Sequence, residues 1–442
     1  MNLKGVVAVF CLCVSSVASA QQGPVLKETP DQKAQRLEWW REARFGMFIH
    51  WGPVSLKGTE ISWSRDAPRR GIDGISGGKG EVPVEVYDNL YKEFNPVKFN
   101  AREWVSIARA AGMKYMVLTA KHCDGFCLWH SKIDHYGIAA TPFKRDVCGE
   151  LADAAHTAGM KIGWYYSPMD WRDPDTRTER NEIWVKIMQG HLRELMSAYG
   201  KIDLLWFDTD GGPAPWDQAN TYALVRSLQP ALIINNRLDM GSLEDYNSQR
   251  ILPNADYATP EQRVGAFDDQ HPWETCMTLG TQWSWKPNDR IKSAQECITI
   301  LTECVSGDGN LLLNVGPMPS GEIEPRQVAV LQEVGAWLEK YGESIYGTRG
   351  GPFKNGAWGG STQRGSTVFL HIKRWEDGKV TLPKLSPVIK RSAMLTGGRV
   401  EVKQMADKIV VAIAAGQAQS SHCIVKLELD GPVIMNVPSD GK

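Results

Sequence analysis

Amphipathic stretches that end at a glycine, each followed by a short apolar run, recur along the first three quarters of the chain. Residues 108–118, 155–166 and 197–208 resemble one another in this way. Glycine suits the left-handed position that follows the last turn of a helix. Apolar runs of this length are typical of buried strands. The repeat therefore predicts helix–strand units joined in series.

Strands separated by helical crossovers pair in parallel. The candidate strands are residues 45–51, 115–122, 161–167, 203–208 and 231–237, with weaker runs at 273–278 and 310–316. Seven or eight units over this length favour a (β/α)₈ barrel over residues 21–346. An open, doubly wound sheet is the alternative, but the first strand lacks the glycine-rich phosphate loop typical of that fold.

The pattern changes after Tyr346. A glycine-rich connection at residues 347–360 leads into short alternating runs at 367–375, 408–413 and 423–429, which are broken by turn residues. Alternation of this kind is typical of half-buried strands in antiparallel sheets. We therefore expect a C-terminal antiparallel β-sandwich over residues 347–442.

The N-terminus has the pattern of an export signal. Lys4 is the only charge before an apolar run, Val6 to Val17, and Ala18-Ser19-Ala20 supplies small residues for cleavage. The run is too short to span a bilayer. We expect residues 1–20 to be a cleaved signal peptide and the mature protein to be periplasmic or secreted.

Composition narrows the function further. The net charge of −1 gives no indication of nucleic-acid binding. The 17 tryptophans are compatible with sugar binding, because flat aromatic faces stack on pyranose rings, but core filling explains them as well. Seven cysteines follow residue 20, an odd number spread over a long chain, so we expect mostly buried thiols. The spacing of Cys123 and Cys127 does not indicate a structural zinc site.

In a barrel, functional side chains follow the carboxyl ends of the strands. That rule selects residues rich in imidazole, aromatic and carboxyl groups: His50, His122, Cys123, Tyr166, Trp206, Asp208, Arg237 and Glu274. Glycoside hydrolysis needs two carboxyl groups, and Asp208 and Glu274 could supply them from separate strands. Residues 74–78 match the Gly-x-Ser-x-Gly pattern of the nucleophile elbow in serine hydrolases. That elbow follows a strand, and no predicted strand precedes these residues, so the match does not indicate a serine nucleophile. The chain contains no HExxH zinc motif and no phosphate loop.

At these positions the sequence resembles a known family. The motifs RFGMFIHWG, AKHCDGF, WYYSPMDW, LLWFD, INNR, WET and GNLLLNVGPMPSGEI occur in the order found in glycoside hydrolase family 29, the α-L-fucosidases, from about residue 38 to 350. The resemblance implies a retaining exo-glycosidase without metal or organic cofactor, with an irregular barrel and a C-terminal β-sandwich. The implied partner is a fucosylated oligosaccharide, glycan or polysaccharide.

The resemblance also implies roles for single residues. Asp208 corresponds to the nucleophile, and Glu274 resembles the acid/base of one branch, a role less fixed between subfamilies. The implied substrate-binding residues are His50, Glu60, Trp63, His122, Cys123, Tyr166, Trp206 and Arg237.

Two departures concern sugar recognition. The family usually has a second histidine where Cys123 stands, and thiols are weak hydrogen-bond donors. Many members also carry glutamate directly before tryptophan. Here Ser62 precedes Trp63, so either Glu60 reaches the site or Ser62 has taken the position. A sister exo-glycosidase for another terminal sugar, such as a galactose-type unit of an algal polysaccharide, is therefore the alternative. A non-catalytic carbohydrate-binding protein is a third reading, which the two carboxyl groups argue against.

Overall fold

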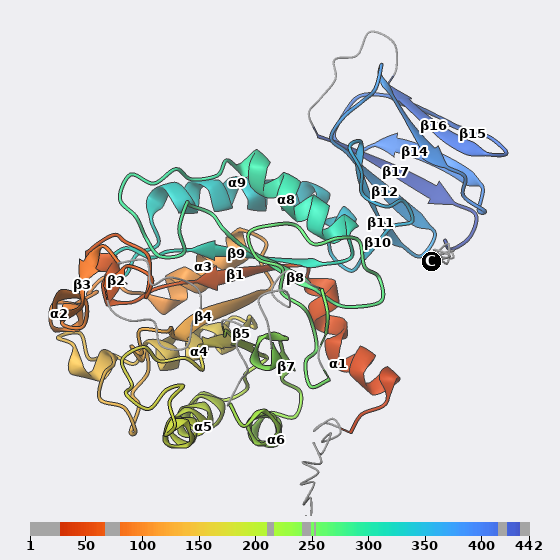
Figure 1. Ribbon diagram of the computed structural model, residues 1–442. Coiled ribbons are helices and arrows are strands. Elements are labelled where there is room, and N and C mark those ends of the chain that lie inside the picture. Colours follow the sequence, from red (N-terminus) through yellow and green to blue (C-terminus); the bar gives the residue numbers. More distant parts are fainter. Residues whose placement is uncertain are drawn as a thin grey trace, which may run out of the picture.

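The computed structural model describes residues 27–66, 80–209, 216–240, 249–251, 253–413 and 422–433. The expected signal peptide, residues 1–20, lies outside these ranges. Two parts are visible in Figure 1: a sheet surrounded by helices, and a smaller all-β part that carries the C-terminal strands. Among the described residues, no helix has both the length and the apolar character needed to cross a membrane.

The larger part is built on a seven-stranded parallel sheet in the order β7-β6-β5-β4-β1-β9-β8. All seven runs expected to be strands contain one of them. Their bounds are β1 (Phe45–Ile49), β4 (Tyr115–Lys121), β5 (Lys161–Tyr166), β6 (Leu204–Phe207), β7 (Ile233–Ile234), β8 (Glu274–Thr278) and β9 (Asn310–Val315).

An irregular segment between the two edge strands closes the barrel. Parallel bridges join Asn235 to Tyr257, Ala258 to Trp273, and Glu261 to Cys276. Backbone hydrogen bonds reinforce them, from Asp256 N to Ile234 O and from Glu274 N to Ala258 O. Residues 256–262 thus occupy the place of an eighth strand between β7 and β8, which makes this an irregular (β/α)₈ barrel, as the sequence predicts.

Helices cover the outside of the sheet (Figure 1). The main ones are α1 (Pro30–Ala43), α3 (Ala101–Ala110), α4 (Val147–Thr157), α5 (Asn181–Ser197), α6 (Gln218–Leu228), α8 (Ala294–Ser306) and α9 (Pro325–Tyr341). Short elements between them are η1 (Pro53–Leu56), β2 (Arg65–Asp66), β3 (Val82–Pro83), α2 (Val84–Tyr87), η2 (Leu90–Lys92), η3 (Ile138–Ala140), η4 (Arg237–Asp239) and η5 (Gly342–Ser344).

Local sequence explains where these helices begin and end. Capping boxes at Thr29 and Ser293 satisfy the first backbone N–H groups of α1 and α8. Gly112, Gly159 and Gly200, which end the repeated helical patterns, have φ values of 81°, 66° and 68°. These are the left-handed positions that the sequence pattern predicts.

Alternate residues of each strand point to opposite sides of the barrel wall. Side chains such as Phe48, Val117, Tyr165 and Trp206 form a buried cluster inside the barrel. Their sequence neighbours belong to the larger core between strands and helices. A shift of one residue along a strand therefore decides whether a side chain can reach the barrel interior.

The C-terminal part is a β-sandwich. Its two antiparallel sheets have the orders β10-β11-β12-β17-β14 and β13-β16-β15. The strands are β10 (Arg349–Gly350), β11 (Gly359–Arg364), β12 (Thr367–Ile372), β13 (Lys379–Pro383), β14 (Ile389–Met394), β15 (Val400–Gln404), β16 (Lys408–Ile413) and β17 (Cys423–Leu429). Their facing side chains share one hydrophobic core. Contacts from Lys373 and Asn355 to Glu303 of α8 attach the sandwich to the barrel.

Candidate active site

The residues that follow the carboxyl ends of the strands converge at one mouth of the barrel. Asp208 follows β6 and Arg237 follows β7, while Glu261 stands near the end of the closing segment. His50 follows β1 and His122 follows β4. Each is carried by a separate strand or strand-like segment, so the barrel wall fixes their relative positions.

Asp208 is held by two donors of different character. Arg237 Nη1 donates to Asp208 Oδ1 at 2.7 Å, and the Tyr165 hydroxyl donates to Oδ2 at 2.7 Å. The side chain keeps 17% of its surface exposed, although Arg237 itself is buried. The carboxylate is therefore oriented through both oxygens and still open to the mouth, which suits a group that must meet a substrate.

Arg237 also holds a second carboxylate. Its Nη2 donates to Glu261 Oε2 at 2.8 Å, and Nε donates to Thr259 Oγ1 at 2.8 Å. The Glu261 side chain is 29% exposed. One planar guanidinium thus fixes two partly exposed carboxyl groups, Asp208 and Glu261, side by side. Sequence reasoning missed Glu261, because residues 256–262 lack the apolar run that marks a strand.

His50 presents a neutral imidazole to the mouth. Its Nδ1 lies 2.7 Å from Asn314 Oδ1, and Asn314 Nδ2 donates to Trp283 O at 2.7 Å. Because the Asn314 amide is oriented by that second bond, Oδ1 accepts and His50 Nδ1 carries the proton. Burial keeps the pKa of His50 well below its ordinary value. His50 Nε2 is then an acceptor, suited to a sugar hydroxyl.

His122 is the second imidazole of the site. Its ring stacks on Tyr165 at 5.3 Å with an interplanar angle of 3°. Its Nδ1 lies 2.6 Å from Ser62 Oγ, which also accepts from Asp124 N. Burial lowers the pKa of His122 to about 4, against the opposing effect of Asp208. Ser62, rather than Glu60, therefore contacts His122 from this loop.

Glu60 and Trp63 lie beside this contact and have other partners. The Glu60 carboxylate accepts from Trp283 N at 2.8 Å and Ser284 N at 3.1 Å, so it ties its loop to the segment after β8. Trp63 is half-buried and packs edge-on against Trp171 at 5.2 Å. Glu60 thus supports the wall that places Trp283 against His50, where the ring centroids are 4.7 Å apart.

Cys123 is a buried thiol rather than an exposed recognition group. It is 1% exposed, and its Sγ lies 3.2 Å from Ser167 Oγ. Ser167 Oγ in turn donates to the Asp208 carbonyl at 3.3 Å. All seven cysteines after residue 20 are buried, as expected.

The expectation that Tyr166 contacts the sugar is wrong. Its hydroxyl lies 3.0 Å from His191 Nδ1 of α5, and its ring belongs to the core outside the barrel wall. The preceding residue, Tyr165, points inward and donates to Asp208. The cause is strand alternation: adjacent tyrosines on β5 must face opposite sides.

The expectation that Glu274 faces Asp208 across the mouth is also wrong. Glu274 is the first residue of β8 and pairs with Asn310 at the start of β9. It lies at the amino ends of the strands and has no exposed surface. Trp206 lies between Glu274 at the base of the barrel and Arg237 at its mouth. The Trp206 indole N–H donates to Glu274 Oε1 at 3.2 Å, and the Arg237 guanidinium carbon lies 4.4 Å from the centre of the ring. Trp206 is therefore the floor beneath the carboxylate pair.

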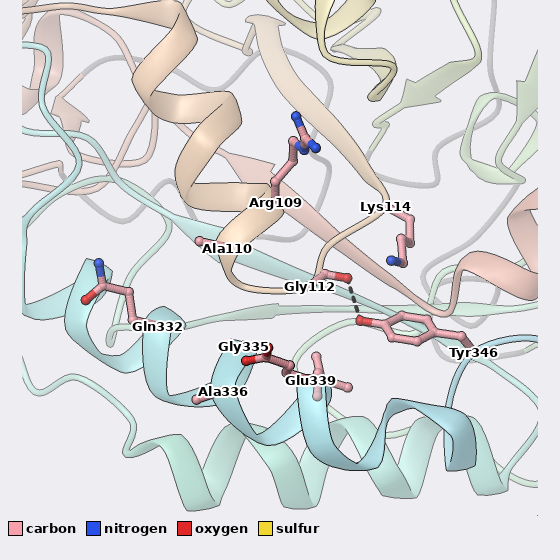
Figure 2. Close-up of a pocket in the computed structure, with 10 residues that line it drawn as sticks. Arg109, Ala110, Gly112, Lys114, Gln332, Gly335, Ala336, Glu339 and Tyr346 are labelled. Atoms are coloured by element: carbon pink, nitrogen blue, oxygen red, sulfur yellow. Dashed lines mark hydrogen bonds between the residues drawn. The ribbon is translucent and has the colours of Figure 1, made fainter.

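Two other features lie away from this mouth. A groove of about 450 Å³ lies between α3 and α9. Its lining residues include Arg109, Lys114, Glu339 and Tyr346, which Figure 2 draws as sticks. Lys114 directly precedes β4, so the groove lies at the opposite end of the strands. Cys127, Asp134 and His191 place potential metal-ligand atoms within 4.8 Å of one another outside the barrel wall. Neither feature contains a residue of the carboxylate pair.

A parallel barrel whose mouth holds two carboxyl groups among neutral histidines and aromatic rings has the architecture of a glycoside hydrolase. The sequence profile described as "Alpha-L-fucosidase" matches residues 12–343. The chain belongs to the α-L-fucosidase family.

Individual relatives agree with this assignment. An α-L-fucosidase of Branchiostoma floridae is 29% identical over 408 residues, covering 85% of this chain and 88% of the relative. The structure of α-L-fucosidase isoenzyme 1 from Paenibacillus thiaminolyticus superimposes with a TM-score of 0.77 at 33% identity, covering 90% of this chain and 99% of that one. A Bacteroides thetaiotaomicron enzyme, solved as a trapped covalent intermediate with a glutamate-to-glutamine mutant, gives 0.76 at 25% identity, covering 92% and 97%.

Proposed function

We propose that the protein is a retaining exo-α-L-fucosidase that releases terminal α-L-fucose from oligosaccharides, glycans or polysaccharides. The observation that carries the proposal is the pair of carboxyl groups, Asp208 and Glu261, held on the Arg237 guanidinium at the barrel mouth. Retaining glycosidases place two carboxyl groups on opposite sides of the scissile bond, one as nucleophile and the other as acid/base.

In the first step, an Asp208 carboxylate oxygen attacks the anomeric carbon. The bond from that carbon to the leaving oxygen breaks, and the Glu261 carboxyl group gives its proton to the departing alcohol. Asp208 is suited to the attack because two donors fix its orientation before substrate arrives, so little reorganisation remains for the transition state.

In the second step, water attacks the same carbon and the Glu261 carboxylate takes its proton. The bond between the anomeric carbon and Asp208 breaks, and fucose leaves with its original anomeric configuration. His50 and His122 accept or donate hydrogen bonds to sugar hydroxyls as neutral imidazoles, while the half-buried Trp283, packed against His50, offers an aromatic face to the C–H side of the ring.

Anion rescue separates the roles of the two carboxyl groups. We expect Asp208→Ala to reduce turnover of an aryl α-L-fucoside by several orders of magnitude, with azide restoring part of it and yielding the inverted fucosyl azide. Glu261→Ala should also lose turnover, but azide should then yield the retained product, because it intercepts the glycosyl-enzyme. Wild-type turnover in Asp208→Ala, or an inverted product from Glu261→Ala, would contradict the assignment.

The sugar itself is tested by a panel of chromogenic α-L-fucoside and α-D- and β-D-galactosides. We expect the fucoside to give the highest kcat/KM. A galactoside that exceeds it would favour the sister exo-glycosidase, because the mechanism would stand while the sugar changed.

We also propose that the chain is exported, on the support of the sequence pattern at residues 1–20. Produced in a Gram-negative host, the full-length chain should reach the periplasm and begin at Gln21. A version lacking residues 1–20 is the control and should stay in the cytoplasm. Uncleaved cytoplasmic protein from the full-length gene would contradict the proposal.

A further inference from the structure

A carboxyl group that the proposed chemistry does not use lies at the base of the barrel. Glu274 Oε2 accepts from Trp40 Nε1 at 3.3 Å and from the Tyr115 hydroxyl, while Oε1 accepts from Trp206 Nε1 at 3.2 Å. These donors come from α1, β4 and β6 and are all uncharged. A buried carboxyl group is costly unless it satisfies other groups. Here three convergent N–H and O–H groups require an acceptor with several lone pairs.

Trp206 connects this carboxyl group to the mouth. The Arg237 guanidinium carbon lies 4.4 Å from the centre of the Trp206 ring, and the Tyr165 ring stacks on it at 5.6 Å with an interplanar angle of 18°. Arg237 and Tyr165 are the two groups that hold the oxygens of Asp208. The orientation of one indole ring therefore supports both of the contacts that orient the nucleophile.

We propose that Glu274 is a positioning residue, which fixes the Trp206 indole through its N–H and so holds Tyr165 and Arg237 where they orient Asp208. The inference rests on the proposed role of Asp208 as nucleophile. Catalytic groups must be held to within about 0.5 Å and 10–20° of the productive geometry. The hydrogen bond to Glu274 is the directional restraint on the indole; the remaining restraints are packing against Phe48 and Tyr165 and the contact with the Arg237 guanidinium.

The experiment compares variants that break the chain of contacts at different links. Glu274→Met removes every acceptor with little change in volume, and Glu274→Gln keeps one acceptor oxygen for Trp206. Tyr115→Phe is the matched control, because it removes a donor from the same carboxyl group and leaves the Trp206 contact intact. Trp206→Phe breaks the same hydrogen bond by removing its donor, the indole N–H, and keeps an aromatic ring at this position. The measurements are kcat and KM on an aryl α-L-fucoside, with and without azide, and Tm.

We expect Glu274→Met to lower kcat by about 10- to 100-fold, the range expected for a misplacement of up to about 1 Å, with a much smaller change in KM. Glu274→Gln should recover most of kcat, and Tyr115→Phe should keep it within about threefold even where Tm falls. Combined with Trp206→Phe, Glu274→Met should lower kcat little further, because both act through one contact.

Three results would overturn the inference: wild-type kcat in Glu274→Met, full additivity with Trp206→Phe, or rescue of Glu274→Met by azide. The last result would make Glu274 the acid/base instead. If Glu274→Met does not fold, Trp206→Phe alone tests the same contact, because it removes the N–H that Glu274 accepts; it should lower kcat by a similar factor, and a wild-type kcat in Trp206→Phe would overturn the inference. Failure of the proposed function gives a different pattern, in which Asp208→Ala keeps wild-type turnover.

Discussion

The side chains of the mouth combine a strongly held carboxylate with imidazoles that carry no charge at neutral pH. Burial lowers the pKa of both His50 and His122, so neither competes with Arg237 for Asp208 as a cation. Neutral imidazoles also suit a neutral, hydroxylated ligand, because one nitrogen donates and the other accepts. Among the described residues of the mouth, Arg237 is the cation that binds the two carboxyl groups, Asp208 and Glu261.

Cys123 allows a test of how tightly this mouth is packed. We expect Cys123→His to lower the free energy of unfolding by about 1–3 kcal/mol, because a larger ring enters a space with almost no exposed surface. It should also lower kcat/KM, since Ser167, which Cys123 contacts, donates to the Asp208 backbone. Urea unfolding and fucoside kinetics measure the two effects.

Cys123→Ser is the control and should leave kcat/KM close to wild type, because it keeps the size and a hydrogen-bonding partner for Ser167. A stable Cys123→His variant with improved fucoside turnover would show that the imidazole finds room and restores a sugar contact that the family usually has.

At the scale of single elements, strand alternation decides which residues can act. On β5, Tyr165 faces Asp208 and Tyr166 faces His191 of α5. The two hydroxyl groups are one residue apart in sequence but lie on opposite sides of the barrel wall. This separation provides a matched pair of variants in one strand.

We expect Tyr165→Phe to lower kcat by about tenfold or more, because Asp208 Oδ2 loses its hydroxyl donor and a hydrogen bond to a charged group contributes about 1.5–3 kcal/mol. Tyr166→Phe should keep kcat/KM near wild type and lower the stability of the fold by about 1 kcal/mol, the contribution of a neutral hydrogen bond. Steady-state kinetics and thermal unfolding measure both variants. The reverse pattern would place Tyr166 in the site.

Sequence reasoning located most of the regular strands because they are continuous apolar runs, although the run at residues 273–278 also contains polar residues. It therefore found Asp208, Arg237, His50 and His122, which directly follow such runs. The same reasoning missed the closing segment, because residues 256–262 include Pro260 and several polar residues and do not form an apolar run. Glu261 was therefore not identified as a strand-end residue. Glu274 was chosen because it stands in one of the weaker candidate strands and resembles the acid/base of one branch of the family, but neither observation says which end of the strand its carboxyl group occupies in the folded barrel.

At the scale of the whole molecule, buried histidines make stability depend on pH. Burial lowers the pKa of His122 and His422 to about 4, and that of His191 and His371 to about 3. The ordinary value is about 6.5. Folding therefore favours their neutral forms: the stabilisation is complete above pH 6.5 and is lost as pH falls towards 4. Carboxyl groups whose pKa burial raises, such as Glu274 to about 7 and Asp239 to about 6, act in the opposite direction and offset part of this pH dependence.

We expect Tm to fall steadily between pH 6.5 and 4.5, since each histidine contributes up to about 1.4 kcal/mol per pH unit. His371→Gln should reduce this slope without changing kcat/KM at pH 7, because His371 lies on β12 in the sandwich and contacts Thr362. Calorimetry over this pH range measures the slope. An unchanged slope in His371→Gln would show that this histidine is not held neutral by the fold.

The irregular closure of the barrel has a consequence for divergence among homologous enzymes. Asp208 follows β6, whose ladder to β5 fixes it in register, whereas Glu261 stands on a segment held by isolated bridges. Insertions and deletions before Glu261 can be absorbed without breaking a ladder, while the same changes before Asp208 would shift a whole strand. Selection can therefore relocate the proton donor between lineages, to suit different leaving groups, while the nucleophile stays in place.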